Sequence, residues 1–133
     1  MKFILDTNVY VSAASSELGW KRFEKHVFPL LPFVYLSSVV VFELSLAKKK
    51  IEDQVFLNHH IAAVQEAGRL VMPSFEDWKD AASLASGNKL RSYLCDILIG
   101  YSARHIGAYL LTFDFKDFIP LSKKLNFQMK RPW

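Results

Sequence analysis

An apolar tripeptide that ends on an acid constrains the fold of this chain more than any other stretch. Phe3, Ile4 and Leu5 are large apolar residues in succession, and Asp6 follows them directly. Such a run predicts a short strand buried on both faces, which is typical of a parallel sheet. Ligands bind outside the carboxyl ends of strands in such sheets. Asp6 is therefore predicted at the rim of a functional crevice, unless it only caps a following helix.

Further short apolar runs predict strands that alternate with helices. Strands are predicted over 33–36, 70–72 and 109–112, with 127–129 as a candidate edge strand. Helices are predicted over 9–14, 18–27, 39–49, 52–68, 75–86 and 92–105, with a loop at 87–91 and a short helical or turn segment at 114–121. Pro29 and Pro32 are predicted to close the second helix and leave a loop. The expected class is α/β, with a parallel sheet of four to five strands flanked by helices in an α/β/α sandwich.

Composition limits the kinds of protein that this chain can be. Its 133 residues fit a single domain, residues 1–133, and 51% of them are hydrophobic, which argues against disorder. One cysteine, Cys95, excludes an internal disulfide framework and a cysteine-based zinc site. No segment has the features of a signal peptide or a membrane span, so we expect a soluble, cytoplasmic protein. The net charge of +4 is mild but compatible with a polyanionic partner.

Two acids fall where a helix would bury them. Glu43 lies four residues after Val39 and four before Ala47, within the apolar stripe of its predicted helix. A carboxylate there is costly to desolvate unless it is paired, bound to a cation or able to reach water. Asp96 shares a helix face with small residues that include Gly100 and Ala103. It also lies near the predicted helix start, where the helix dipole would favour an acid in any case.

The end of a later strand repeats the arrangement at Asp6. Asp114 follows Thr112 and a buried apolar run, and Asp117 lies one helical turn further along. Asp114 could instead cap a helix, with Asp117 as a solvated acid. If the strands that precede Asp6 and Asp114 are neighbours, their ends flank one crevice.

Several carboxylates cannot share one crevice in ionised form without a compensating charge. Mg²⁺ would supply it, since this ion favours oxygen ligands and retains several waters. It could orient a phosphodiester and activate a bound water. Nearby neutral groups that could orient carboxylates or water are Thr7, Asn8 and Thr112.

Taken together, these segments resemble PIN-domain ribonucleases, most closely the VapC-type toxins of toxin–antitoxin pairs. The resemblance covers the whole chain and rests on four segments: Ile4-Leu5-Asp6-Thr7-Asn8, Glu43, Cys95-Asp96-Ile97-Leu98-Ile99 and Leu111-Thr112-Phe113-Asp114-Phe115-Lys116-Asp117-Phe118. It implies a Mg²⁺- or Mn²⁺-dependent endoribonuclease, a cognate antitoxin and a homodimer. Carried over by position, the catalytic and metal-binding acids are Asp6, Glu43, Asp96 and Asp114, with Asp117 in support or in place of Asp114.

Basic residues are expected to contact the RNA backbone, and the candidates are Lys48, Lys49, Lys50, Lys89 and Arg91. For each of them taken singly, ordinary solvated surface charge is favoured over a contact with RNA. Two other functions stay open: a PIN-fold nuclease of RNA processing that is no toxin, and a non-catalytic PIN-fold module that binds protein. An aspartyl phosphatase is disfavoured because no second acid follows closely after Asp6. A phosphate loop of the P-loop type does not occur in the sequence.

Overall fold

The computed structural model describes residues 1–47, 51–86 and 93–133, with the backbone alone for 51–54. It contains a five-stranded sheet in which all neighbouring strands are parallel, in the order β3-β2-β1-β4-β5. The strands are β1 (Phe3–Leu5), β2 (Val34–Ser37), β3 (Leu70–Val71), β4 (Tyr109–Leu111) and β5 (Gln128–Lys130). The α/β class with a flanked parallel sheet is thus confirmed, and residues 128–130 form the expected edge strand.

The first strand occupies the centre of the sheet, as its apolar sequence predicts. Phe3, Ile4 and Leu5 are all buried, and β1 pairs with β2 on one side and with β4 on the other. From β1 the chain builds outward to β3, then returns to place β4 on the opposite side of β1. The order of strands therefore reverses between β1 and β4. This reversal creates the crevice at which open α/β sheets bind ligands.

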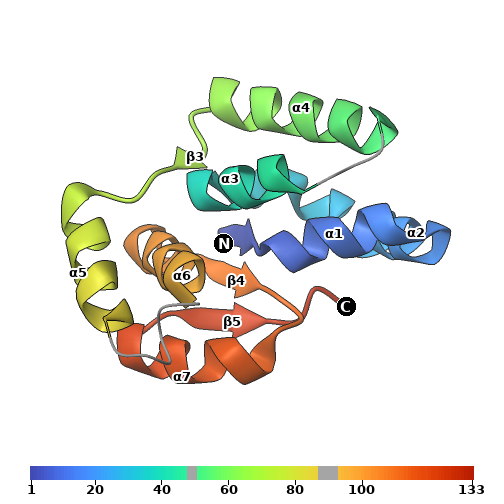
Figure 1. The fold of residues 1–133 in the computed structure, drawn as a ribbon. Coiled ribbons are helices and arrows are strands. Elements are labelled where there is room, and N and C mark those ends of the chain that lie inside the picture. Colours follow the sequence, from blue (N-terminus) through green and yellow to red (C-terminus); the bar gives the residue numbers. More distant parts are fainter. Residues whose placement is uncertain (48–50, 87–92) are drawn as a thin grey trace.

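Seven α-helices flank the sheet in the described part of the chain. They are α1 (Thr7–Ser15), α2 (Glu17–His26), α3 (Ser38–Leu46), α4 (Ile51–Glu66), α5 (Phe75–Ala85), α6 (Leu94–Ile106) and α7 (Phe115–Leu125). Figure 1 shows α3 and α4 near β3 at the top of the molecule and α7 beside β5 at the bottom. No helix among the described residues has the length and apolar character needed to cross a membrane.

Most predicted boundaries differ from the structure by one or two residues, and three predictions were wrong by more. Residues Phe28–Phe33 form a 3₁₀-helix, η1, where a loop was expected, because a proline near the start of a helical segment lacks an N–H that would be unpaired anyway. Helix α3 ends at Leu46, since Ala47 is already extended with ψ 134°. Helix α7 continues past Pro120 to Leu125, and its residues Phe118, Leu121 and Leu125 are buried. The predicted loop at 87–91 lies outside the described residues.

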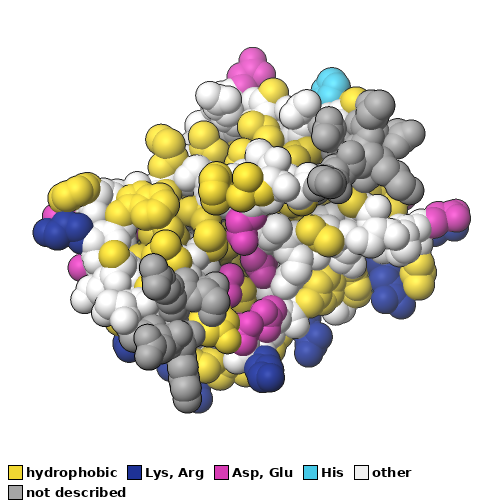
Figure 2. Space-filling model, viewed as in Figure 1, with side chains coloured by type: hydrophobic (Ala, Val, Ile, Leu, Met, Phe, Trp, Pro, Cys, Tyr) yellow, Lys and Arg dark blue, Asp and Glu magenta, His cyan; other side chains and the backbone are white. Residues whose placement is uncertain are grey.

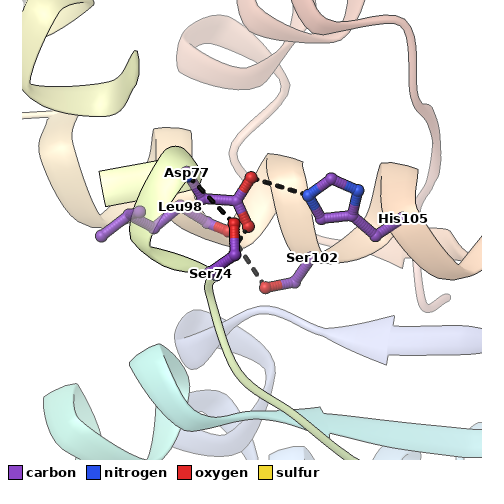
Figure 3. A network of polar contacts seen from close by, with 5 residues as sticks. All are labelled: Ser74, Asp77, Leu98, Ser102 and His105. Carbon is purple, nitrogen blue, oxygen red and sulfur yellow. Dashed lines mark hydrogen bonds and ion pairs between the residues drawn. The ribbon is translucent and has the colours of Figure 1, made fainter. Parts of the chain in front are cut away.

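A polar link joins α5 to α6, away from the strand ends. Ser74 and Asp77 form a capping box at the start of α5, and Nε2 of His105 lies 2.7 Å from Oδ1 of Asp77 (Figure 3). Burial raises the pKa of Asp77, but the hydrogen bonds from His105 and Ser74 outweigh burial and hold that pKa below its usual value. Next to this link, the Ser102 hydroxyl donates to the Leu98 carbonyl within α6. The contact between His105 and Asp77 thus links α6, the helix on which Asp96 lies, to α5.

Helix α6 approaches the β5 side of the core closely. A Cβ atom at position 100 would stand 2.7 Å from Cε1 of Phe127, so only glycine fits there without a shift. Ala103 on the same helix is fully buried. The small residues that share a face with Asp96 therefore permit the close approach of α6 to Phe127.

Candidate active site

The carboxyl ends of β1 and β4 bring two of the predicted acids to one edge of the sheet. Asp6 directly follows β1, and its backbone N–H donates to the Leu111 carbonyl, the last residue of β4, at 2.9 Å. Asp114 comes three residues after Leu111, just past the end of β4. Figure 2 shows acidic side chains running down the middle of this face, in the region between α3 and α7 in Figure 1.

Thr7 links two carboxylates that lie far apart in the sequence. Its backbone N–H donates to Oδ1 of Asp6 at 2.8 Å, and its hydroxyl donates to Oε1 of Glu43 at 2.7 Å. The first contact makes Asp6 the N-cap of α1, so the capping role and a place in the crevice are compatible. The second contact holds the Glu43 side chain on α3 toward the end of β1. One threonine thus fixes the spacing of two acids.

Thr112 organises the opposite side of the crevice. Its buried hydroxyl donates to Oδ2 of Asp6 at 2.8 Å. The Thr112 hydroxyl oxygen also accepts hydrogen bonds, from Nδ2 of Asn8 at 3.2 Å and from the Asp114 backbone N–H at 3.0 Å. The Asn8 amide oxygen in turn accepts from the Phe113 N–H at 3.3 Å. Three neutral groups therefore orient the ends of β1 and β4 relative to each other.

Asp114 and Asp117 stand together at the start of α7. Asp114 is the N-cap, and its Oδ1 accepts from the Asp117 N–H at 3.1 Å. The Asp117 carboxylate accepts from the Tyr93 hydroxyl at 3.3 Å. Burial, followed by the neighbouring Asp117 carboxylate, raises the pKa of Asp114 above its usual value. Both acids therefore contribute negative charge to the same corner of the site.

The surroundings of Asp6 disfavour the ionised form of its carboxyl group. It is only 5% exposed, and burial is the main reason that its pKa is raised from 3.8 to about 6. The hydrogen bonds from Thr112 and Thr7 oppose this shift, while the charges of Glu43 and Asp114 add to it. Its negative form is thus stabilised by two donors and destabilised by burial and two acids.

The pKa of Asp96 is raised further than that of Asp6. It lies in the first turn of α6, where the helix dipole alone would lower its pKa. Burial, reinforced by the charges of Asp6, Glu43, Asp114 and Asp117, instead raises that pKa from 3.8 to about 7. The dipole therefore does not explain this acid. The contributions of four other carboxylates show that each of them lies within electrostatic range of Asp96.

None of these acids forms an ion pair with a protein cation in the described part of the chain, although the charge of Lys116 acts on Asp114. The ion pairs found there join Lys21 to Glu17, Lys79 to Glu76 and His105 to Asp77. Glu43, for which a buried ion pair was one alternative, is instead partly exposed and accepts a hydrogen bond from Thr7. Among the described residues, the acids of the crevice are therefore not held in ion pairs.

The donor set suits a hard divalent cation in its chemistry. Within the described residues, no three carboxylate, imidazole or thiol groups stand close enough together to hold an ion as they are. Mg²⁺, however, is commonly held by one or two carboxylates, several waters and substrate phosphates. Asp6 and Glu43, which share Thr7, offer such a pair, and Asp96 adds a third acid within electrostatic range.

Sequence reasoning missed Tyr93. Tyr93 immediately precedes α6, and its hydroxyl contact with Asp117 spans 24 residues, so no local pattern could indicate it. The five predicted RNA-binding residues, Lys48, Lys49, Lys50, Lys89 and Arg91, lie outside the described residues. Cys95 is partly buried, and burial raises the pKa of its thiol, with Glu43 and Asp96 adding to the shift.

Comparison with known proteins shows the same fold in several solved complexes. No family model and no curated protein matches this sequence. A chain of FitAcB from Neisseria gonorrhoeae is 21% identical, with a TM-score of 0.66 over 98% of both chains. A chain of VapBC2 from Rickettsia felis, bound to a DNA fragment from their promoter, is 25% identical, with a TM-score of 0.57 over 100% of this chain and 99% of that one. A chain of DNA-bound VapBC from Salmonella typhimurium is 18% identical, with a TM-score of 0.55 over 100% and 99%.

Proposed function

We propose that this chain is a Mg²⁺- or Mn²⁺-dependent endoribonuclease of the PIN type. The observation that carries the proposal is the group of carboxylates at the β1 and β4 ends, with the pKa of Asp6 raised to about 6 and that of Asp96 to about 7. Strongly perturbed acids in a crevice are typical of functional sites. Since these acids form no ion pairs with protein cations in the described residues, a bound divalent cation accounts for their proximity.

Asp6, Glu43, Asp96 and Asp114 would hold the metal ion, which supplies Lewis acidity toward a phosphodiester and lowers the pKa of a bound water. Thr7 and Thr112 keep two of these carboxylates oriented through hydrogen bonds of 2.7–2.8 Å. Their preorganisation limits the reorganisation needed when a phosphate enters. Asp117 stands next to Asp114 and either supports it or takes its place as the fourth acid.

The comparisons support a further proposal, that this nuclease is the toxin of a toxin–antitoxin pair. VapBC complexes are among the structures that share its fold, and its sequence motifs resemble those of VapC-type toxins. The acidic crevice favours the nuclease component, because an antitoxin has no need for buried, mutually repelling carboxylates. A cognate antitoxin and a homodimer remain predictions.

Metal-dependent cleavage of RNA tests the enzymatic proposal. The purified protein is incubated with a mixed RNA substrate in Mn²⁺ or in EDTA, beside Asp96→Asn. Asp80→Asn is the matched control, because Asp80 is an exposed acid on α5. We expect cleavage in Mn²⁺ by the wild type and Asp80→Asn, and none by Asp96→Asn or in EDTA.

The other outcomes are equally informative. Equal cleavage by all three proteins would indicate a contaminating nuclease and contradict the proposal. If the wild type neither cleaves RNA nor binds Mn²⁺ by calorimetry, the chain is a non-catalytic module that keeps the fold.

A further inference from the structure

A pair of exposed cations borders the acidic crevice on the β5 side. Lys116 is the second residue of α7, and Arg131 follows the last residue of β5. Both side chains are exposed. Figure 2 shows Lys or Arg side chains directly below the lower end of the acidic column. We propose that Lys116 and Arg131 form a phosphate-binding edge that holds the RNA strand next to its cleavage point, an inference that rests on the proposed nuclease function.

Backbone pairing fixes the place of Arg131. Leu111 of β4 pairs with Lys130 of β5, and the Thr112 N–H donates to the Lys130 carbonyl at 3.1 Å. Arg131 therefore leaves the sheet beside the residue that organises the crevice. Its guanidinium carbon lies 4.9 Å from the centre of the Phe115 ring. Stacking on the ring restricts the side chain, so less conformational entropy is lost when it binds a phosphate.

Lys116 lies on the same rim. It lies between Asp117 and Phe115 in the sequence, and the Arg131 guanidinium lies over the Phe115 ring. The positive charge of Lys116 opposes the rise in the pKa of Asp114, although burial and the Asp117 carboxylate outweigh it. None of the ion pairs in the described part of the chain uses Lys116, so its ammonium group is available to a ligand.

The arrangement of charges matches an extended polyanion. A phosphate at the crevice is opposed by the acids and needs a divalent cation, whereas the next phosphate along the strand meets two positive side chains. Arg and Lys contacts to phosphates fix the position of a strand without reading its sequence. The edge therefore determines where the strand lies, and its contribution falls as salt concentration rises.

Salt-dependent RNA binding tests this edge without catalysis. The wild type, Lys116→Gln, Arg131→Gln and Arg131→Lys are titrated against a fluorescent single-stranded RNA in EDTA at several salt concentrations. Each phosphate contact on a single strand contributes a slope of about −0.7 to log K against log salt. We expect each Gln variant to lose about 0.7 of the slope and to bind roughly 5- to 20-fold more weakly at low salt. Arg131→Lys should keep the slope and lose part of the affinity.

Lys79→Gln is the matched control. Lys79 on α5 lies 5.6 Å from the ring of Phe75, the first residue of its helix, just as Arg131 lies over the first residue of α7. This variant has the same change of charge and the same lost ring contact, and we expect wild-type binding. In cleavage assays with Mn²⁺, the Lys116 and Arg131 variants should raise KM and leave kcat unchanged, because the contact is made before and during the reaction alike.

The result distinguishes failure of the edge from failure of the nuclease. If the wild type binds and cleaves RNA while both Gln variants keep its slope, the phosphate edge is wrong and the nuclease stands. Equal weakening by Lys79→Gln would show only a general charge effect and overturn the edge. If the wild type neither binds nor cleaves RNA, the proposed function is wrong, and the edge with it.

Discussion

Replacing Asp96 with Asn should stabilise the protein in the absence of metal. The carboxyl group of Asp96 is partly buried among four other acids, and its pKa is raised from 3.8 to about 7. An acid whose pKa is raised by folding destabilises the folded state wherever the unfolded chain is ionised. Asn has nearly the same shape and no charge, so it removes that penalty.

The size of the effect follows from the shift in pKa. At pH 8 Asp96 is largely ionised in both the folded and the unfolded chain. Its raised pKa then lowers the free energy of unfolding by about 4 kcal/mol, at about 1.4 kcal/mol per pKa unit. Water that reaches the partly exposed side chain screens the charges, so we expect about 2 kcal/mol. At pH 5 the unfolded chain still ionises while the folded one stays protonated, and the stabilisation shrinks to about 1 kcal/mol. Below pH 3.8 it vanishes, because both states are protonated.

Urea denaturation in EDTA at pH 8 and pH 5 measures the difference in the free energy of unfolding. Asp80→Asn, an exposed acid on α5, controls for the general loss of one negative charge. Added Mn²⁺ should then raise the stability of the wild type and not that of Asp96→Asn, since a ligand at 100 times its Kd adds about 2.7 kcal/mol. A variant that is less stable than the wild type at pH 8, or a difference independent of pH, would refute the electrostatic argument.

Three smaller predictions concern groups that support the fold. Burial, with the charge of Arg69, lowers the pKa of His60 from 6.5 to about 4. The free energy of unfolding should therefore fall by up to about 3 kcal/mol as pH drops from 6.5 to 4. Urea denaturation should show much less of this loss in His60→Leu. Thr112→Val should lower the free energy of unfolding by about 2–3 kcal/mol, because it leaves buried partners unpaired, whereas Thr112→Ser should stay close to the wild type. Ser74→Ala removes the cap of α5 and should lower thermal stability by about 1 kcal/mol in calorimetry, and an unchanged melting temperature would contradict the capping role.

The sequence was sufficient to predict the strands, because they are short apolar runs with clear ends. Phe3–Leu5 was predicted to the residue, and the strand after Gly107 differs only in its last residue. Helix ends were less predictable where two signals competed. Pro29 and Pro32 indicated a break in the helix, yet the chain keeps turning through them as a 3₁₀-helix. Similarly, Pro120 does not end α7, since the buried face formed by Phe118, Leu121 and Leu125 continues past it.

The site could be predicted only as far as residue type and strand position carry information. The acids stood out because Asp6 and Asp114 follow apolar runs, whereas Glu43 and Asp96 fall on apolar helix faces. The contacts that hold them could not be predicted: the Thr7–Glu43 hydrogen bond spans 36 residues, and the Thr112–Asp6 bond spans 106. Both depend on which strands are neighbours, and a single sequence does not encode strand order locally. The same limit hid Tyr93 and the place of Arg131 beside Thr112.

The choice of neutral donors inside the crevice and cations at its edge has a physical consequence. A lysine in the place of Thr7 or Thr112 would lower the pKa of Asp6 and remove a folding penalty of about 3 kcal/mol. It would also occupy the position proposed for the divalent cation. Hydroxyl groups orient the carboxylates without cancelling their charge, so their repulsion persists unless a cation binds. Under the proposed function, Lys116 and Arg131 would act on the substrate only from outside the crevice. The folding penalty of the ionised acids and the proposed affinity for a cation would then be two results of the same arrangement.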